Sequence, residues 1–341
     1  MKKAILITLI SVILVSAFVA VKYYITFYQP NTVENNAEIY IYENDSYSEF
    51  LETLFDSNVL ARIKTFKKAA DKLGLADVLK PGHYLVPASL TNKELIRIFA
   101  NGYQTPINLV VKGYVRNWES MAAYFGERLQ SDSTTFINTL RDEALMKELG
   151  FTKESYLGLI IPDTYEVWWT ISPEDLLRRM KKEYDAFWDE SRKAKAKAIG
   201  LTQDEVMTLA SIVIEESKYE PEMPTIAGVY INRLKKGIKL QADPTVKYAL
   251  NSSGITRILT NHLTINSPYN TYIYAGLPPG PITIAPKVAI DAVLNYQHHK
   301  YLYFCAKDTF DGQHNFAVSY TEHLRNARAY QKALSASNAS K

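Results

Sequence analysis

The sequence predicts an α+β protein with an N-terminal membrane helix, a small module of two strands and two helices, and a larger, helix-rich α+β domain. Three observations lead to this prediction. An apolar run follows two lysines at the N-terminus, two short alternating segments then flank a pair of short helical segments, and most later periodic segments have helical spacing. The 341 residues leave room for two domains of ordinary size.

The apolar run, Ala4–Val21, contains no charged side chain and approaches the length of about 20 residues that a bilayer crossing needs. Lysines precede it and Lys22-Tyr-Tyr24 follows it, so the positive-inside rule places the N-terminus in the cytoplasm and the remaining chain outside. A cleaved signal peptide is the alternative, because Val15-Ser-Ala17 resembles a small-residue cleavage site. We favour an anchor over residues 1–28, because the apolar run continues past that site.

A polar segment without periodicity, residues 29–36, is expected to be a short stalk. Residues 37–102 are predicted to form a module. Its strand, two helices and second strand are expected at Glu38–Tyr42, Ser46–Leu54, Ala61–Leu73 and Lys80–Val86. This order is typical of a LysM-like carbohydrate-binding fold, although a spacer that binds no ligand fits the same pattern.

The larger domain is predicted to cover residues 103–341, because Gly102–Pro106 interrupts the periodicity. Its expected elements are a strand at Ile107–Val111, helices at Asn117–Leu129, Ser172–Lys197 and Thr225–Lys236, a short helix from Asp243, and a hairpin formed by Tyr301–Phe304 and Gly312–Phe316. The aromatic side chains of Ile161–Trp169 fit either sugar contacts or a core. Two turn-rich segments, Ser267–Tyr272 and Gly276–Pro281, are expected to line a cleft.

One further helix carries two neighbouring carboxylates in its last turn. Thr202-Gln-Asp-Glu205 is a capping box, so the helix is predicted to begin at residue 203. Because Pro221 disfavours the helical conformation at the residue before it, the helix is predicted to end near Lys218. Projection at about 3.6 residues per turn places Glu216 on the apolar stripe, one turn beyond Ile212.

A high pKa is expected for Glu216. Burial disfavours its ionised form, and the negative end of the helix dipole acts in the same direction. A general acid that works near neutral pH requires this property. Glu215 falls beside Thr208 and Ser211 and is expected to stay ionised in solvent. Because glutamates near helix ends are commonly solvated, an ordinary surface role for Glu216 is the competing interpretation.

Composition excludes several other classes of function. The net charge of +3 is spread without basic blocks, so no nucleic-acid partner is expected. Cys305 is the only cysteine, which excludes an intramolecular disulfide and a cysteine-based metal cluster. The sequence contains no phosphate-binding glycine loop, HExxH motif or nucleophile elbow.

Several segments of the chain form a specific set. They are Pro162-Asp-Thr-Tyr165, Ala210-Ser-Ile-Val213 with Glu216-Ser217, Tyr230-Ile-Asn-Arg-Leu234, Leu240-Gln-Ala-Asp-Pro-Thr-Val246, Ser267-Pro-Tyr-Asn-Thr-Tyr272, Gly276-Leu-Pro-Pro-Gly280, Tyr301-Leu-Tyr-Phe304, and the tail from His314 to His323. Taken together they resemble the endolytic murein (lytic) transglycosylases, the MltG or YceG-like family. The resemblance implies a single-pass protein of the inner membrane, with a LysM-like module and a catalytic domain that contains a lysozyme-like catalytic helix.

The resemblance also implies cleavage of the β-1,4 bond between N-acetylmuramic acid (MurNAc) and N-acetylglucosamine (GlcNAc) in nascent strands, which leaves 1,6-anhydroMurNAc ends and terminates elongation. The family's essential glutamate falls on Glu216, in agreement with the helical projection. Two departures are visible. Glu215 stands where relatives often have lysine, and Leu157 stands where an acidic residue often precedes the Pro-Asp-Thr-Tyr segment, so any role for that upstream carboxylate is in doubt.

A single acid suffices for this reaction if the sugar's own hydroxyl is the nucleophile, and no metal or organic cofactor is needed. Gln241, Asn270 and Tyr272 are candidates for hydrogen bonding to the substrate, although each fits a role within its own loop. Asp243 is a fourth candidate and the second carboxylate that a hydrolase would use, but its position before Pro244 favours a helix cap.

Three functions therefore remain open from the sequence. The first is a membrane-anchored lytic transglycosylase that acts on peptidoglycan glycan strands, with peptidoglycan synthases as candidate partners. The second is a muramidase that uses water, and the third is a glycan-binding scaffold without activity. The chemical form of the product ends separates the first from the second, and the absence of any soluble product identifies the third.

Overall fold

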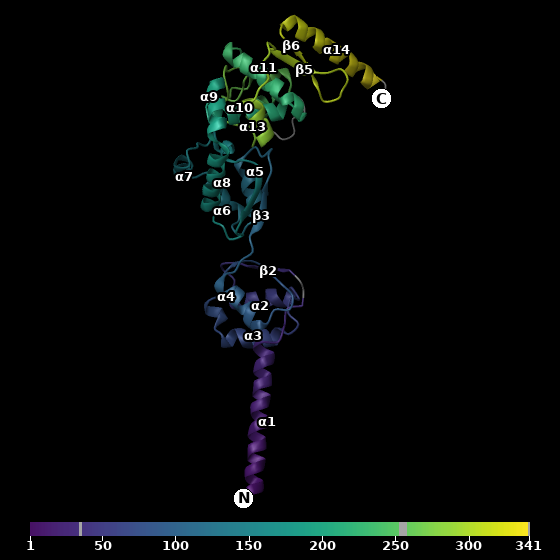
Figure 1. The fold of residues 1–341 in the computed structure, drawn as a ribbon. Helices are drawn as coiled ribbons and strands as arrows, with labels where there is room; N and C mark the ends of the chain where they lie inside the picture. Colours follow the sequence, from purple (N-terminus) through teal and green to yellow (C-terminus); the bar gives the residue numbers. More distant parts are fainter. Residues whose placement is uncertain (34–35, 252–257, 340–341) are drawn as a thin grey trace. The chain divides into compact units, whose positions relative to one another are not determined.

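The structure is a computed structural model and describes residues 1–33, 36–251 and 258–339. Its internal contacts divide the chain into two units (Figure 1). The first consists of Met1–Leu109, Arg128–Gln130 and Glu166–Ile171. The second consists of Val110–Glu127, Ser131–Tyr165 and the described chain from Ser172 onward. Together they form a mixed, helix-rich α+β structure with an apolar helix at the N-terminus, as the sequence predicts.

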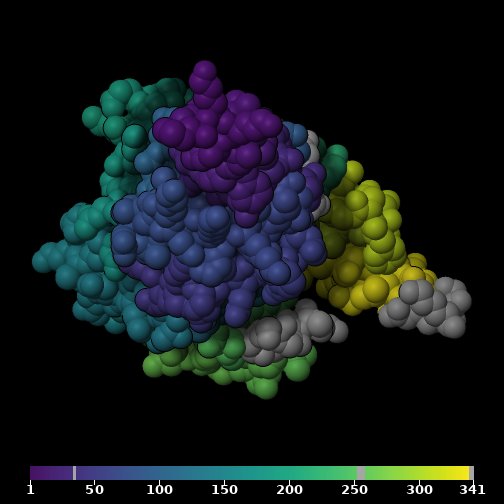
Figure 2. All heavy atoms as spheres, turned by 90° about the horizontal axis from the view of Figure 1, so that it is seen from below, coloured from purple at the N-terminus to yellow at the C-terminus, as the bar shows by residue number. Residues whose placement is uncertain are grey.

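The first unit begins with α1 (Lys2–Phe27), which contains a stretch of mean hydropathy 2.9. By length and composition α1 suffices to cross a membrane, and a signal sequence would have the same properties. Figure 2 views the molecule from below, with the purple atoms of α1 in front of the blue atoms of the same unit. The helix is exposed as far as Tyr24, whereas Thr26 and Phe27 are buried against the rest of the first unit.

The rest of the first unit contains the predicted order of strand, helix, helix and strand. Its elements are β1 (Ala37–Ile41), α2 (Tyr47–Asp56), α3 (Ile63–Lys72), a 3-10 turn η1 (Leu75–Asp77), β2 (Gly82–Val86) and α4 (Asn92–Asn101). β1 and β2 pair antiparallel, with Ile39 opposite Tyr84. Phe99 of α4 meets Phe50 and Tyr84 edge to face, at ring distances of 5.2 and 5.1 Å. α4 therefore belongs to the core of this unit.

The expected stalk is a packed segment over its described residues; residues 34 and 35 lie outside the described part of the chain. Asn31 is only 1% exposed and donates a hydrogen bond of 2.7 Å to Asn92 Oδ1. Thr32 Oγ1 donates to the carbonyl oxygen of Pro87 at 2.8 Å. Polar composition and missing periodicity predicted a stalk here, because side-chain hydrogen bonds between distant segments leave no periodicity in the sequence.

Asn92 joins three segments of the first unit. Its side-chain amide also donates to the carbonyl oxygen of Thr26 at 2.8 Å. We expect Asn92→Ala to lower the free energy of unfolding by about 1–3 kcal/mol, because buried partners would lose their hydrogen bonds. Asn101→Ala, at the exposed end of the same helix, is the matched control. Chemical denaturation of the full chain in detergent micelles measures both, and equal effects would contradict this role of Asn92.

The chain passes between the two units along a two-stranded sheet of β3 (Ile107–Val111) and β4 (Asp163–Val167), each with residues in both units. After β4, Trp169 is buried in the first unit against Tyr40 and Tyr42, at ring distances of 5.1 and 4.8 Å. Trp168 is 50% exposed. The core interpretation therefore holds for Trp169 and not for its neighbour.

The second unit is mainly helical. Its helices are α5 (Trp118–Gly126), α6 (Ser133–Leu140), α7 (Glu143–Glu148), α8 (Pro173–Phe187), α9 (Glu190–Ile199), α10 (Gln203–Glu216), α11 (Met223–Lys235), α12 (Asp243–Ala249), α13 (Lys287–Leu294) and α14 (Tyr320–Ala339). Short 3-10 turns are η2 (Tyr156–Leu159), η3 (Glu220–Glu222) and η4 (Thr260–Thr264), and the hairpin strands are β5 (Tyr303–Ala306) and β6 (His314–Ala317).

The long helix predicted over Ser172–Lys197 is two helices, α8 and α9. The break falls at Trp188, whose backbone leaves the helical region, and Asp189 then caps α9 through the amide of Arg192 at 2.8 Å. The side chain of Trp188 is only 1% exposed. The sequence pattern does not reveal this break, because charged residues surround Asp189 and hide its role as a helix cap.

α10 is the central helix of the second unit. Every residue from Val206 to Ile214 is buried, so the helix is covered on all sides and not only along one stripe. α11, α12 and α13 pack against it. Its buried hydroxyls are satisfied locally, because Thr208 donates to the carbonyl oxygen of Asp204 at 2.8 Å and Ser211 to that of Thr208 at 2.7 Å. This packing fixes the position of the two carboxylates at the end of α10.

Candidate active site

Glu216 is the last residue of α10. The predicted capping box at the other end is present: Glu205 N donates to Thr202 Oγ1 at 3.2 Å, and Thr202 N donates to the Glu205 carboxylate at 2.7 Å. The helix stops two residues earlier than expected, because Ser217 adopts an extended conformation with φ −145° and ψ 136°. The early stop makes Glu216 the terminal helical residue, at the negative end of the dipole.

The Glu216 carboxyl is desolvated and accepts one hydrogen bond within the described structure. Tyr230 of α11, only 2% exposed, donates its hydroxyl to Glu216 Oε1 at 2.6 Å. Burial raises the pKa of Glu216 to about 7; the charges of Asp243 and Glu215 act in the same direction, whereas the Tyr230 hydrogen bond and Lys247 oppose the rise. The expected rise in pKa is therefore confirmed. Near neutral pH this carboxyl exists in both protonation states.

The neighbouring carboxylate has a different environment. Glu215 pairs with Arg116, from the loop before α5, and its side chain is only 14% exposed. The expectation that Glu215 stays in solvent is therefore wrong. Helical projection places a residue on one side of its own helix, and it contains no information about a distant loop that covers that side. The Glu215 carboxylate therefore pairs with a guanidinium, whereas the Glu216 carboxyl accepts a hydrogen bond from a neutral phenol.

The Glu216 carboxyl lies in a cavity of about 380 Å³. Its walls come from α10, α11, the start of α12, the 267–272 loop, β5 and α14. The lining residues are Glu216, Tyr230, Arg233, Leu240, Gln241, Asp243, Tyr272, Tyr303, Phe304, Tyr320 and His323. In the described part of the chain, no group of three or more His, Cys, Asp or Glu side chains is arranged to hold a metal ion.

Asp243 lines this cavity and does not cap α12. It is the first residue of the helix, and the preceding residue, Ala242, makes no side-chain cap. The Asp243 carboxylate instead accepts a hydrogen bond of 2.7 Å from the Tyr272 hydroxyl. The capping interpretation is therefore wrong. Asp before Pro is a common helix start, and that local pattern does not reveal a partner 29 residues away.

Gln241 and Arg233 also line this cavity. Arg233 donates to Gln241 Oε1 at 3.2 Å and to the carbonyl oxygens of Leu240 and Leu302 at 2.8 and 2.6 Å. Gln241 has φ +51°, a conformation that non-glycine residues seldom adopt. Arg233 thus ties the α11–α12 connection to the chain before β5 and holds the Gln241 amide at the cavity.

Asn270 is placed differently from the other three candidates. It is 0% exposed, its amide nitrogen donates to the carbonyl oxygens of Leu263 and Ile265 at 2.9 and 2.8 Å, and its oxygen accepts from Tyr272 N at 3.0 Å. These bonds occupy the amide within its own loop. Asn270 therefore supports the loop that presents Tyr272, and we assign it no contact with substrate.

The chain also matches known proteins. A family model described as the YceG-like family matches residues 39–329. The chain belongs to this family. The YceG-like match runs through both units and includes every residue of the cavity described above.

Two curated relatives of this YceG-like chain are named endolytic murein transglycosylase. The Bacillus subtilis protein is 34% identical over 61% of this chain and 57% of its own length, and a Streptococcus pneumoniae protein is 27% identical over 73% and 50%. The chain thus spans about half the length of the curated relatives it matches. A crystal structure of a yceG-like protein from Listeria monocytogenes has the same fold, with a TM-score of 0.56 and 24% identity, covering 84% of this chain and 97% of that one.

Several cavity residues were not predicted from the sequence. Tyr230 and Arg233 lie in a segment that the family resemblance includes, and their spacing of three places both on one face of α11. That spacing was the available signal. Tyr303 and His323 stack at 5.5 Å beside Arg233, which lies over the Tyr303 ring at 5.1 Å. Only the folding of the hairpin and α14 onto α11 brings these rings to the cavity.

The raised pKa of Glu216 predicts a pH-dependent stability. The unfolded chain releases this proton near pH 4.5 and the folded chain near pH 7, so the Glu216 contribution to stability falls as pH rises between these values. We expect Glu216→Gln to equal the parent near pH 4.5 and to be more stable by roughly 1–3 kcal/mol above pH 7. Glu190→Gln, at a side chain 92% exposed, is the control. Denaturation series across this range measure the difference, and a pH-independent difference would contradict the assignment.

Proposed function

We propose that this chain is an endolytic peptidoglycan lytic transglycosylase, with Glu216 as its single acid and base. The observation that carries the proposal is the Glu216 carboxyl, buried at a helix end in an open cavity with a pKa near 7. The names of the curated relatives support the same activity. A carboxyl with this pKa donates a proton and takes one back without a large free-energy cost at neutral pH.

In the proposed reaction the protonated Glu216 carboxyl gives its proton to the glycosidic oxygen between MurNAc and GlcNAc. The bond from that oxygen to C1 of MurNAc breaks with its electron pair on the leaving GlcNAc hydroxyl. The C6 hydroxyl of the same MurNAc then bonds to C1, and its proton passes to the Glu216 carboxylate. Atoms balance without water, the enzyme returns to its starting state, and the new end is a 1,6-anhydro ring.

Other cavity groups have supporting roles in this proposal. Tyr230 orients the Glu216 carboxyl and leaves its second oxygen open to the substrate. Gln241, Tyr272 and Asp243 offer an amide, a hydroxyl and a carboxylate to sugar hydroxyls and acetamido groups. In this proposal α10 acts as a lysozyme-like catalytic helix.

Hydrolysis is the second candidate, because Asp243 places another carboxylate in the same cavity. A muramidase would use it as base or nucleophile, and the separation of the two carboxyl groups would then set the stereochemical outcome. Two findings favour transglycosylation: Asp243 already accepts the Tyr272 hydroxyl, and its negative charge helps to keep Glu216 protonated. Mass spectrometry separates the two reactions, because an anhydro end is lighter by one water.

We expect Glu216→Gln to lower the yield of anhydro ends by about 10²- to 10⁴-fold, because glutamine keeps the size of the side chain but transfers no proton. Glu215→Gln is the matched control on the same helical turn and should retain most activity, since its partner Arg116 lies outside the cavity lining. Mass spectrometry of purified glycan strands after incubation with the full chain measures both. Equal losses of activity in the two variants would show that the wrong carboxylate is assigned. If the parent protein releases no soluble product, the remaining interpretation is a glycan-binding scaffold without activity.

We further propose that α1 is a retained anchor over residues 1–28, with the N-terminus in the cytoplasm, and that the rest of the first unit and the second unit lie outside the inner membrane. Residues 37–102 would act as a LysM-like, glycan-binding module and residues 103–341 as the catalytic domain, acting on nascent strands beside peptidoglycan synthases. The length of α1 supports retention, because its apolar stretch continues past the small-residue site at Ala17.

This topology makes a direct prediction. Protease added to spheroplasts should degrade both units, because they lie outside the cytoplasmic membrane. A cytoplasmic protein measured in the same samples is the control for membrane integrity. Protection of this chain together with the cytoplasmic control would contradict the proposed orientation.

A further inference from the structure

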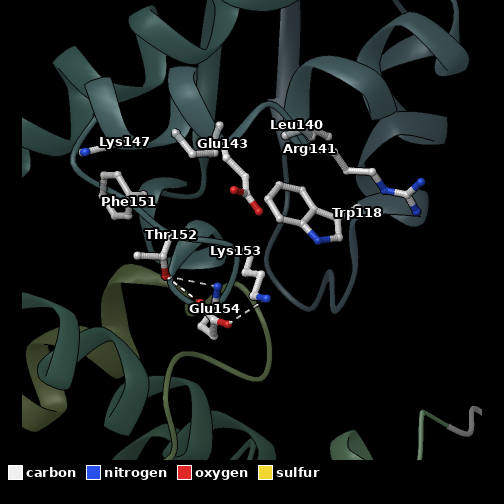
Figure 3. A pocket seen from close by; sticks show the side chains of 10 residues that line it. Trp118, Leu140, Arg141, Glu143, Lys147, Phe151, Thr152, Lys153 and Glu154 are labelled. Carbon is white, nitrogen blue, oxygen red and sulfur yellow. Dashed lines mark hydrogen bonds and ion pairs between the residues drawn. The ribbon is translucent and has the colours of Figure 1, made fainter.

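The second unit contains a larger cavity that the Glu216 site does not use. Its volume is about 610 Å³, within the range of about 300–1,000 Å³ typical of ligand sites (Figure 3). The lining comes from α5, the end of α6, α7 and the following loop. These residues are Trp118, Leu140, Arg141, Glu143, Met146, Lys147, Phe151, Thr152, Lys153 and Glu154. Apolar walls from Leu140, Met146 and Phe151 meet a polar rim.

Trp118 is an aromatic platform in this cavity. Its indole lies parallel to the ring of Tyr156, with the centroids 3.4 Å apart and the planes at 7°. Tyr156 is only 3% exposed, so it fixes the indole from one side. The remaining surface of Trp118 lines the cavity. A supported ring of this kind suits the apolar face of a sugar and loses little conformational entropy when the sugar binds.

Polar groups accompany the platform. The Glu143 carboxylate points into the cavity on the side of Trp118 (Figure 3). Within the described chain no hydrogen bond or ion pair engages it. On the rim, Lys153 lies 3.8 Å from Glu154, a loose pair in which the lysine side chain is 70% exposed. A free carboxylate and a loosely held ammonium beside an aromatic ring match the hydroxyl and acetamido groups that edge an amino sugar.

Two further tyrosines lie near Tyr156, the ring that supports Trp118. Burial raises the pKa of Tyr156, and the neighbouring Tyr248 and Tyr269 contribute to the rise. The rings of Tyr248 and Tyr269 lie 4.7 Å apart. Tyr248 belongs to α12, the helix that begins at Asp243 in the Glu216 cavity and rises about 1.5 Å per residue. α12 therefore extends from Asp243 in the Glu216 cavity to the ring pair formed by Tyr248 and Tyr269.

The backbone also joins the two cavities. A Cβ atom on Gly280 would lie 2.0 Å from the carbonyl oxygen of Glu154, so only glycine allows the 276–281 loop to touch the rim of the second cavity. Directly after this loop, Ile282 N donates to Ser211 Oγ on α10 at 3.0 Å. The rim at Glu154 is thus fixed relative to the helix that carries Glu216.

We propose that the Trp118 cavity is a second saccharide-binding site, which holds a distant stretch of the same peptidoglycan glycan strand whose bond lies at Glu216. The choice of glycan as the occupant rests on the proposed function. Trp118 stacks on one sugar, and Glu143 accepts hydrogen bonds from its hydroxyl or acetamido groups. Two separated sites favour long strands over short fragments and place the cut away from strand ends.

Calorimetric titration with peptide-free peptidoglycan strands tests the proposal. The protein is the full chain in detergent micelles, carrying Glu216→Gln so that the ligand stays intact. Added Trp118→Ala should weaken the dissociation constant for strands of several disaccharides about tenfold, and added Glu143→Gln about three- to tenfold. Trp118→Phe should retain most of the affinity, because it keeps a ring on Tyr156. Glu190→Gln, on the exposed face of α9, is the matched control for Glu143→Gln.

A single disaccharide unit is the second ligand. The affinity of this disaccharide for the Glu216 cavity should be the same in the protein with added Trp118→Ala as in the protein without it. If neither Trp118→Ala nor Glu143→Gln changes the affinity for long strands, or if long strands do not bind, the second site is overturned. If the affinity depends on both residues but the chain with Glu216 intact cuts no glycan, the second site stands and the proposed activity fails.

Discussion

The burial of one carboxyl group at the end of α10 is the constraint on which the rest of the second unit depends. A glutamate in that position costs folding free energy when it is ionised, and the only hydrogen bond to it in the described structure comes from a neutral phenol, Tyr230. The charge of Lys247 also acts on it, but burial outweighs that effect and its pKa stays raised. An arrangement that maximised stability would pair both carboxylates. A carboxyl with a raised pKa that lines a cavity is typical of a functional group.

The surrounding elements keep that group in place. α10 is buried along nine consecutive residues, which leaves its end no freedom to move. Arg233 joins α11, the α11–α12 connection and the chain before β5 through backbone carbonyl oxygens, so the walls of the cavity form around one side chain. On the far side, His314 and Glu222 join β6 to η3 at 3.0 Å. The site is therefore built on packed helices with a hairpin laid across them.

The sequence predicted the elements better than the contacts. Local signals gave α10, its capping box, the order of strands and helices before residue 102, and Glu216 as the carboxyl with a raised pKa. It failed where the deciding partner is distant: Arg116 covers Glu215, Tyr272 takes the Asp243 carboxylate, and Asn31 packs on Asn92. Periodicity and capping patterns act within about one or two turns of chain, so they contain no information about such partners. The aromatic lining from β5 and α14 was missed for the same reason.

The most direct test of the account is a titration of Glu216 itself. Carbon-13 NMR of the full chain with labelled glutamate carboxyls, in detergent micelles, reports each protonation, and the signal absent from Glu216→Gln identifies the residue. The account predicts a midpoint near pH 7 for Glu216. A midpoint near pH 4.5, the ordinary value for a solvated glutamate, would show that the carboxyl is not desolvated and would remove the physical basis for its assignment as the acid.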